Sequence, residues 1–470
     1  LDAAGSAGAE LALDLRRRVA EQLLRGGYVD RGLTAIDSVL SAIGVRMPRG
    51  PLASLLAFLG RRLQLALRGR RWTRRDAASL PTEELTRLDA FGTIGKSLPL
   101  VDPVRGAYAL TRALLVALRL GEPARVARML AFEGGYLAAF GRQERAAALV
   151  RIAEQEAQRT GDAEALALAA NVEAIIQYLG ANRWRDALRG QTEADLRNRE
   201  LQAAGWETDT SQLFACFNLM YLGEVAELTR RVAAYLAEAK RRGDRYHEVS
   251  LRTRLGLIWL AVDDPERASR EAAEGIASWL PASRGFHVQH LYALHTRCEA
   301  WLYRGDPASA AAAMTTAHRL VRRSLLLNMS MLRVEYAHLS GRIALAMAAR
   351  ATPGERRAGI RRARRFARQL VRTRRPVAEP LAALLNAGAD AIAGRDQRAA
   401  EQLRAAIAGF DALDTGLHAA AARRRLGQLL GAGDGTALIA DGDAFMARQG
   451  IRNPERMTEM LIPHWAPAGG

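Results

Sequence analysis

Apolar side chains recur along most of this chain at intervals of three and four residues, which places them on one side of an α-helix. Ala, Leu and Arg dominate the composition and aromatic residues are only 6%, so little of the chain suits a sheet. The pattern predicts an all-α protein, with helices over residues 8–25, 31–43, 51–70, 81–98, 104–120, 123–139, 142–160, 163–179, 183–203, 207–222, 225–242, 245–261, 265–280, 287–303, 307–325, 328–350, 354–374, 377–393, 396–413, 416–430, 434–449 and 453–461.

The interruptions between these helices share one register. The segments that begin at Gly121, Gly223, Asp263, Gly305 and Gly394 each carry an apolar or small residue five positions later. Such a segment makes a tight turn between antiparallel helices, because a small residue ends one helix, an acidic residue caps the next and Pro fits its first turn. Asp264-Pro265 and Asp306-Pro307 fit best. The residues just before the turns are predicted core residues: Tyr178, Leu179, Tyr221, Leu222, Trp301, Leu302 and Tyr303.

The turns recur at the spacing of helical-hairpin repeats. Gly180, Gly223, Asp263, Gly305, Gly354, Gly394 and Gly431 lie roughly 37 to 49 residues apart. A helix pair of this length cannot bury its apolar side alone, so neighbouring pairs must stack into a solenoid whose concave surface is suited to binding. Residues 44–103 are the least regular. We therefore expect irregular helical repeats in residues 1–103 and regular repeats in residues 104–470.

Charge and cysteine content bear on location and partners. The net charge is +18, but only Lys96 and Lys240 are lysines, so the excess is arginine in an alanine-rich background of the kind that GC-rich codon use produces. Binding of nucleic acid or another polyanion is therefore a second hypothesis and the less favoured one. Cys216 and Cys298 match no disulfide spacing, which indicates a reducing, cytoplasmic location.

Targeting signals are missing from the pattern. No apolar run has the length of a membrane span, and residues 1–10 lack the features of a signal peptide, so we expect no membrane association. The sequence opens on Leu1 within a helical pattern, which suggests a piece of a longer chain.

Residues 90–97, with the sequence AFGTIGKS, satisfy the loose pattern of a phosphate-binding loop. Such a loop needs a buried strand before it and a helix after it, so that backbone N–H groups surround the phosphates. Here a charged helical pattern precedes the motif and the sequence LPLVDP follows it. We therefore expect an ordinary helix or turn, and a nucleotide-hydrolysing enzyme that uses Lys96 is a third hypothesis.

Four side chains with metal-binding chemistry, His287, His290, His295 and Cys298, share one broad side of a predicted helix. Imidazole and thiolate suit zinc or copper, but ligands strung along one helix do not meet at one ion without a partner such as His318. Packed histidines, or histidines on the concave surface, are the favoured interpretation. No metal or cofactor site is predicted in this chain.

Two stretches are strongly basic. In residues 356–375, an apolar side is formed by Ile360, Ala363, Ala367, Leu370 and Val371, and arginines occupy the rest. Residues 61–75 form a second basic cluster around Trp72. A solvated outer face is the favoured interpretation of both, and docking to an acidic partner is the alternative.

The sequence predicts binding rather than catalysis. It contains no nucleophile elbow, HExxH pair, Rossmann glycine turn or kinase HRD and DFG set, so no catalytic residue is predicted. A protein or small-molecule ligand is expected on the concave surface of the central repeats. The residues predicted to line it are Arg252, Arg254, His287, His290 and Tyr292.

Three segments, residues 95–128, 187–236 and 285–306, resemble the helical C-terminal region of large bacterial serine/threonine protein kinases. They include the phrases LGEVAELTRR, which begins at Leu222, and GFHVQHLY, which begins at Gly285. In that family a kinase domain is followed by an AAA-like signal-transduction ATPase and then by a tetratricopeptide-like tail. The resemblance spans about residues 10–465 of this sequence.

This resemblance implies a right-handed tetratricopeptide-like superhelix with a non-catalytic sensory and regulatory role. It implies partners in cis, namely the upstream kinase and ATPase modules, which would bind ATP and magnesium. None of the family's catalytic residues falls on a position of this chain, and the resemblance places Lys96 inside the helical tail.

Overall fold

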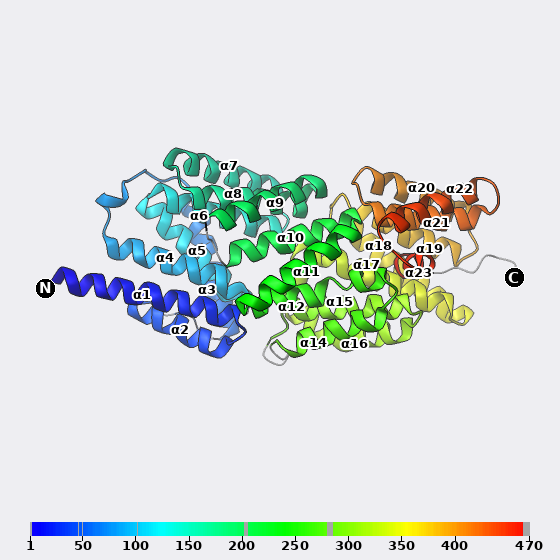
Figure 1. Ribbon diagram of the computed structural model, residues 1–470, viewed down its shortest axis with the longest axis horizontal. Helices are drawn as coiled ribbons and strands as arrows, with labels where there is room; N and C mark the ends of the chain where they lie inside the picture. The colour runs from blue at the N-terminus through cyan, green and yellow to red at the C-terminus, as the bar shows by residue number, and fades with distance from the viewer. Residues whose placement is uncertain are drawn as a thin grey trace.

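The chain is all-helical in the computed structural model, which describes residues 2–45, 47–48, 50–100, 102–201, 205–279 and 285–463. Helices make up 82% of the residues in these ranges, and no strand forms among them. The 23 α-helices of this part of the chain pack in neighbouring pairs, which is consistent with an all-α repeat fold (Figure 1). The all-α prediction is confirmed.

The N-terminal half contains α1 (Asp2–Arg25), α2 (Val29–Ala42), α3 (Pro51–Arg68), α4 (Thr82–Ser97), α5 (Pro103–Leu120), α6 (Pro123–Ala139), α7 (Gln143–Thr160), α8 (Ala163–Ile176), α9 (Trp184–Glu200), α10 (Trp206–Leu222) and α11 (Val225–Arg242). The remainder contains α12 (Arg245–Arg254), α13 (Leu257–Ala261), α14 (Pro265–Ala277), α15 (Val288–Tyr303), α16 (Pro307–Arg323), α17 (Ser330–Ala349), α18 (Pro353–Val371), α19 (Ala378–Ala391), α20 (Asp396–Asp411), α21 (Gly416–Leu430), α22 (Asp434–Arg448) and α23 (Pro454–Leu461). Short helical turns are η1 (Ala77–Ser79), η2 (Leu98–Leu100), η3 (Gln177–Ala181) and η5 (Leu326–Asn328).

Local capping explains where many of these helices begin. Asp102, Glu122, Asp264 and Asp306 each accept a hydrogen bond from a backbone N–H of the first turn that follows, and a proline opens each of these helices. The Asp306 carboxylate, for example, accepts from the Ser309 N–H at 3.1 Å. The predicted turn chemistry at Asp264-Pro265 and Asp306-Pro307 is confirmed.

Most of the predicted turns and core residues are also confirmed. The five aligned turn residues have positive φ angles between 62° and 79°: Gly121, Gly223, Asp263, Gly305 and Gly394. The predicted core residues are buried, apart from Trp301, which is partly buried.

Two predicted turn residues are misplaced. Gly180 lies within the π-helical turn η3, and Asn182 takes the left-handed conformation instead, with a φ of 54°. Gly354 lies in the first turn of α18, which begins at Pro353. The helix predicted over residues 245–261 is wrong as well, since it divides into α12 and α13. Gly256, between them, packs so closely on α15 that a methyl group there would come within 2.3 Å of Thr296 Cγ2.

Helices that are far apart in the sequence also lie side by side. The Arg375 guanidinium donates to Leu179 O at 3.1 Å, and the Val377 N–H donates to Asn182 Oδ1 at 3.1 Å. The Trp184 indole donates to Thr415 Oγ1 at 3.2 Å. One apolar core runs from Ala20 to Ile462 through these contacts. The later helices therefore complete the packing of the earlier ones rather than extend a simple row.

The proposed boundary near Pro103 falls between two helices in contact. Pro103 opens α5, and α4 packs on α5 across the connection. The division into residues 1–103 and 104–470 stays a prediction. None of the described helices is long and apolar enough to cross a membrane.

Gly223→Ala is expected to destabilise the protein more than Gly243→Ala. Both glycines end a helix in the left-handed conformation, with φ angles of 76° and 65°, so both substitutions carry a strain of about 1–2 kcal/mol. A methyl group at Gly223 would also come within 2.5 Å of the Leu417 backbone nitrogen, whereas one at Gly243 would meet nothing within 4 Å. This overlap adds about 1–3 kcal/mol, measurable as the difference in unfolding free energy in urea. Equal losses would contradict the packing of α10 on α21.

Candidate functional site

Arg254, one of the predicted ligand residues, lies in the middle of the chain where α10, α12, α15 and α17 meet. It is only 5% exposed, and its Nη2 donates to Glu335 Oε1 at 2.7 Å. Its guanidinium lies 5.8 Å from the ring centroid of Phe217 and 5.6 Å from that of Tyr292. Burial opposes the charge, but Glu335 and the neighbouring tyrosines hold the pKa of Arg254 above its ordinary value. Arg254 is therefore a fixed internal cation.

Glu335 joins this arginine to an aromatic cluster. The Tyr221 hydroxyl donates to the same oxygen, Glu335 Oε1, at 3.0 Å. Tyr221 stacks on Trp184 with ring centroids 4.3 Å apart, and Tyr178 meets Trp184 edge to face. Burial and the Glu335 carboxylate raise the pKa of Tyr221 well above its ordinary value, so the phenol stays a neutral donor.

Arg252 lies two residues earlier on α12 and faces another helix. Its Nε donates to Glu271 Oε2 and its Nη2 to Glu274 Oε2, both at 2.7 Å. Both carboxylates belong to α14. Arg252 and Arg254 therefore point toward different neighbours and do not converge on one ligand.

His287 and His290 organise the start of α15. The His287 N–H donates to His290 Nδ1 at 3.1 Å, and the Trp279 indole donates to His287 Nδ1 at 3.3 Å. The two rings serve the N-terminus of the helix, where backbone N–H groups lack partners within the helix. Tyr292 is the predicted residue on α15 that faces the Arg254 cluster.

A small pocket lies between α15 and α17, beside this cluster. The gap between its walls, open solvent at the mouth included, measures about 270 Å³. Its lining is mostly apolar, with one carboxylate and one imidazole, and consists of Leu291, Tyr292, Leu294, His295, Met314, Leu332, Glu335, Tyr336 and Leu339. Of the five predicted ligand residues, only Tyr292 lines the pocket. Arg254 does not line it but donates to Glu335, which does.

A second ion-pair cluster lies on the same side of α17, two turns after Glu335. Arg342 Nη2 donates to Glu299 Oε1 at 2.8 Å, and His295 Nε2 lies 3.4 Å from the same oxygen. Burial favours the neutral form of Glu299, but His295 and Arg342 outweigh it and lower the pKa of Glu299 well below its ordinary value. Arg342 also donates to Met460 O at 3.2 Å, which fixes α23 against α17.

The comparisons with known proteins add no relative. No model of a known protein family matches this chain, and no curated protein matches its sequence. The kinase-tail resemblance therefore stays a prediction, and the site is argued from its own geometry.

The histidines and cysteine considered for metal binding serve packing contacts. Cys298 is buried, its Sγ lies 3.7 Å from Ala310 O, and burial raises its pKa to about 12. His318 is exposed on α16, with Nδ1 3.4 Å from the Tyr336 hydroxyl. Within the described ranges, no three His, Cys, Asp or Glu side chains are grouped so that they could hold a metal ion.

Lys96, from the sequence AFGTIGKS, is part of helix α4 and not of a loop. Its ammonium lies 3.0 Å from Glu207 Oε1 and 3.7 Å from Glu21 Oε1. Burial opposes the charge, but the two carboxylates raise the pKa of Lys96 above its ordinary value. The expectation of an ordinary helix is confirmed.

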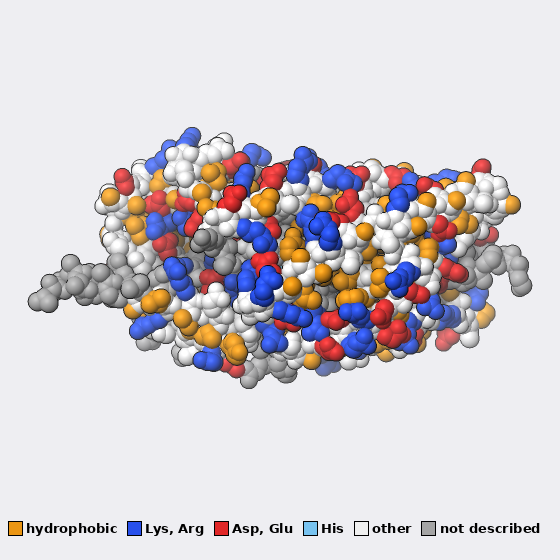
Figure 2. All heavy atoms as spheres, in the orientation of Figure 1, with side chains coloured by type: hydrophobic (Ala, Val, Ile, Leu, Met, Phe, Trp, Pro, Cys, Tyr) orange, Lys and Arg blue, Asp and Glu red, His pale blue; other side chains and the backbone are white. Residues whose placement is uncertain are grey.

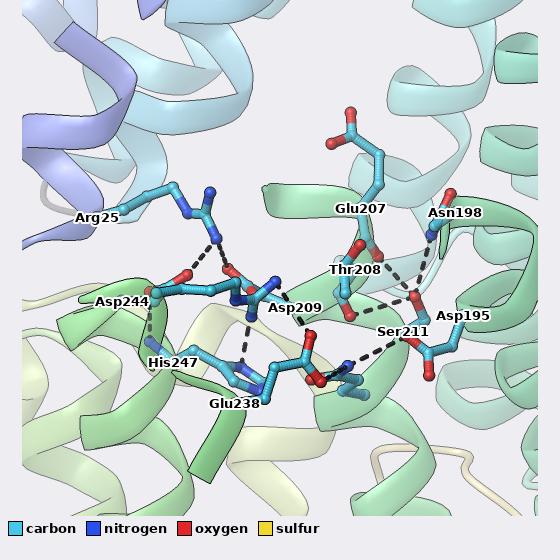
Figure 3. Close-up of polar contacts among 12 residues, drawn as sticks. Arg25, Asp195, Asn198, Glu207, Thr208, Asp209, Ser211, Glu238, Asp244 and His247 are labelled. Carbon is cyan, nitrogen blue, oxygen red and sulfur yellow. Dashed lines mark hydrogen bonds and ion pairs between the residues drawn. The ribbon is translucent and has the colours of Figure 1, made fainter. Parts of the chain in front are cut away.

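A buried polar cluster ties α1 to the centre of the chain (Figure 3). Arg25 Nη2 lies 2.8 Å from Asp209 Oδ2 and also contacts Asp244, and Arg242 Nη2 donates to Asp209 Oδ1 at 2.9 Å. Burial and Asp209 raise the pKa of Asp244 to about 6, although Arg25 opposes the shift. Burial lowers the pKa of His247 to about 4. The cluster is a structural connection in which each charge is matched.

Stability is expected to fall as the pH drops from about 6.5 to 4. Burial lowers the pKa values of His247 and His418 to about 4, and that of His338 well below its ordinary value. The unfolded chain then binds protons that the folded chain does not, and among the described acidic groups only Asp244, whose pKa is raised, acts in the opposite sense.

Urea unfolding across this pH range measures the effect. His418→Phe removes one such buried histidine beside Phe410. It should reduce the slope of the unfolding free energy against pH by about 1.4 kcal/mol per pH unit. The matched change at exposed His318 should leave the slope unchanged. Identical slopes for both variants and the parent would refute this assignment.

Proposed function

We propose that this chain is a non-catalytic sensory and protein-interaction repeat region in signal transduction, built as a right-handed tetratricopeptide-like superhelix. The observation that carries the proposal is the pocket between α15 and α17. It combines apolar walls with a carboxylate that Arg254 and Tyr221 already hold in place. Its enclosed space holds about one water molecule, so a partner side chain would enter only as the lining side chains move apart.

The pocket chemistry defines that side chain. Its walls favour an apolar or aromatic group, and both described hydrogen bonds to Glu335 fall on Oε1. The entering group would therefore place an N–H or O–H donor near Oε2. Because Glu335 lies on α17 with Arg342, a bound partner acts on the helix that holds α12, α15 and α23 together.

The wider setting of the proposal is a cytoplasmic serine/threonine kinase with an ATPase module, as the sequence resemblance implies. ATP and magnesium would serve those upstream modules. The repeat region would bias them by binding its ligand more tightly in one state of the parent protein than in the other.

Filling the pocket tests this site. Met314→Trp enlarges a side chain that lines the space between α15 and α17, and binding of short random peptides on an array is the measurement. We expect retained peptides to share an apolar or aromatic anchor, and Met314→Trp to weaken their binding about tenfold. Met347→Trp is the matched control, because Met347 is 40% exposed elsewhere on α17. Peptide binding that is unchanged by Met314→Trp would show that the pocket is not the binding site.

The second candidate function, polyanion binding, has one specific observation in its favour. Among the described residues, six arginines of α18 are exposed and form no ion pair: Arg356, Arg357, Arg361, Arg362, Arg365 and Arg368. The helix packs through Ile360, Ala363, Ala367 and Leu370, as predicted, whereas Val371 is 50% exposed. Elsewhere acidic and basic side chains alternate over the face seen in Figure 2.

Charge reversal on α18 tests the polyanion function. The triple change Arg361→Glu, Arg365→Glu and Arg368→Glu should weaken binding to duplex DNA at least tenfold. It should also reduce the slope of log K against log salt concentration, whose magnitude is about 0.9 per phosphate contact. The control reverses Arg319, Arg322 and Arg323 of α16, which are also exposed and give the same net charge. Equal losses in both variants would indicate diffuse charge attraction, and binding that does not change with salt would exclude this function.

A further inference from the structure

The outer side of α3 carries an uncovered row of leucines. Leu52, Leu56, Leu59, Leu63 and Leu67 are 69%, 60%, 51%, 61% and 80% exposed, and together they are called the leucine face. Single exposed leucines are ordinary on a protein surface, but a continuous apolar row of this kind marks an interaction site.

The spacing of the leucine face is that of a helix that packs on another helix. The intervals of four, three, four and four residues keep the five side chains on one side over about 22 Å. The opposite side of α3 is already used, because Phe58 meets Tyr136 and Arg62 Nη1 donates to Glu133 Oε2 at 2.7 Å, both on α6. The leucine face is therefore not needed for the packing of the described chain.

Gly60 makes a notch in the middle of this face. A glycine inside a helix costs about 0.5–1 kcal/mol relative to alanine, so a close neighbour usually explains it. A methyl group at Gly60 would meet nothing within 4 Å, so no described neighbour requires the glycine. The missing side chain leaves room between the leucines for a side chain of a partner.

The charge around α3 restricts what the partner is. Residues 38–75 contain nine arginines and no acidic residue. Exposed Arg68, Arg71 and Arg75 lie at and after the last turn of α3 in the sequence, and the Arg68 guanidinium donates to Leu118 O and Arg71 O. A second copy of the chain would bring arginines against arginines. A lipid surface favours basic residues along both edges of the helix, but the charge of Arg62 is already matched by Glu133.

We propose that α3 docks an amphipathic helix of a partner protein, with an apolar seam on the leucine face and acidic residues beside Arg68, Arg71 and Arg75. A large apolar side chain of that helix would enter the notch at Gly60. The surface lies on a different helix from the α15–α17 pocket and does not depend on the proposed function, so the two proposals are tested by different variants.

Two synthetic helices serve as probes in fluorescence anisotropy. Both carry leucine at the a and d positions of each heptad, and one has glutamate and the other lysine at e and g. We expect the acidic helix to bind at least tenfold more tightly than the lysine twin. Leu56→Lys with Leu63→Lys should abolish this binding, although the added positive charge would strengthen any purely electrostatic attraction.

The same double change at Leu196 and Leu430, which are 57% and 40% exposed, is the matched control and should leave binding intact. A second variant, Gly60→Trp, fills the notch and should weaken binding while the thermal unfolding of the chain is retained. Equal binding of both probes, or no binding, overturns the proposal. So does binding to phosphatidylserine vesicles, or self-association in sedimentation, if either is lost with Leu56→Lys and Leu63→Lys.

Discussion

The pairing of buried charges on α17 is the constraint that the centre of this structure depends on. Glu335 and Arg342 lie two turns apart on a helix that is buried on most sides, and each of these charges is paired with an opposite charge inside the protein. Arg254 supplies that charge from α12 and Glu299 supplies it from α15. The positions of both helices, and of the pocket between α15 and α17, are fixed by these two pairs.

Most helices could be predicted from the sequence because their ends are determined by capping residues within one turn. Asp306 and Pro307 act within one turn, so the chain shows them without reference to any other part. The break at Gly256 was not predicted, and the residue that Gly256 packs against, Thr296, lies on another helix. Asn182 was missed as a turn residue for a similar reason. Its side chain accepts a hydrogen bond from Val377, which is far away in the sequence.

The candidate site was only partly readable. Arg254 and Tyr292 were identified by their position on central helices, but the sequence could not reveal that Glu335 is the ion-pair partner of Arg254. A signal for Glu335 was nevertheless present: polar residues at 335, 338 and 342 follow helical spacing within a mostly apolar segment. Such a stripe indicates an internal polar network. The exposure of α3 had no such signal, because an apolar stripe in a sequence looks the same whether it is covered or not.

The contacts between distant helices change how this chain must fold. In a simple row of repeats each unit depends only on its neighbours, and folding can spread from any point. Here Asn182 and Leu179 form hydrogen bonds with Val377 and Arg375. Trp184 forms one with Thr415. During synthesis the middle of the protein therefore stays incompletely packed until residues 375–415 leave the ribosome, and loop closure over roughly 200 residues slows this step. Until then, apolar side chains that these later helices cover in the folded protein remain exposed on the nascent chain.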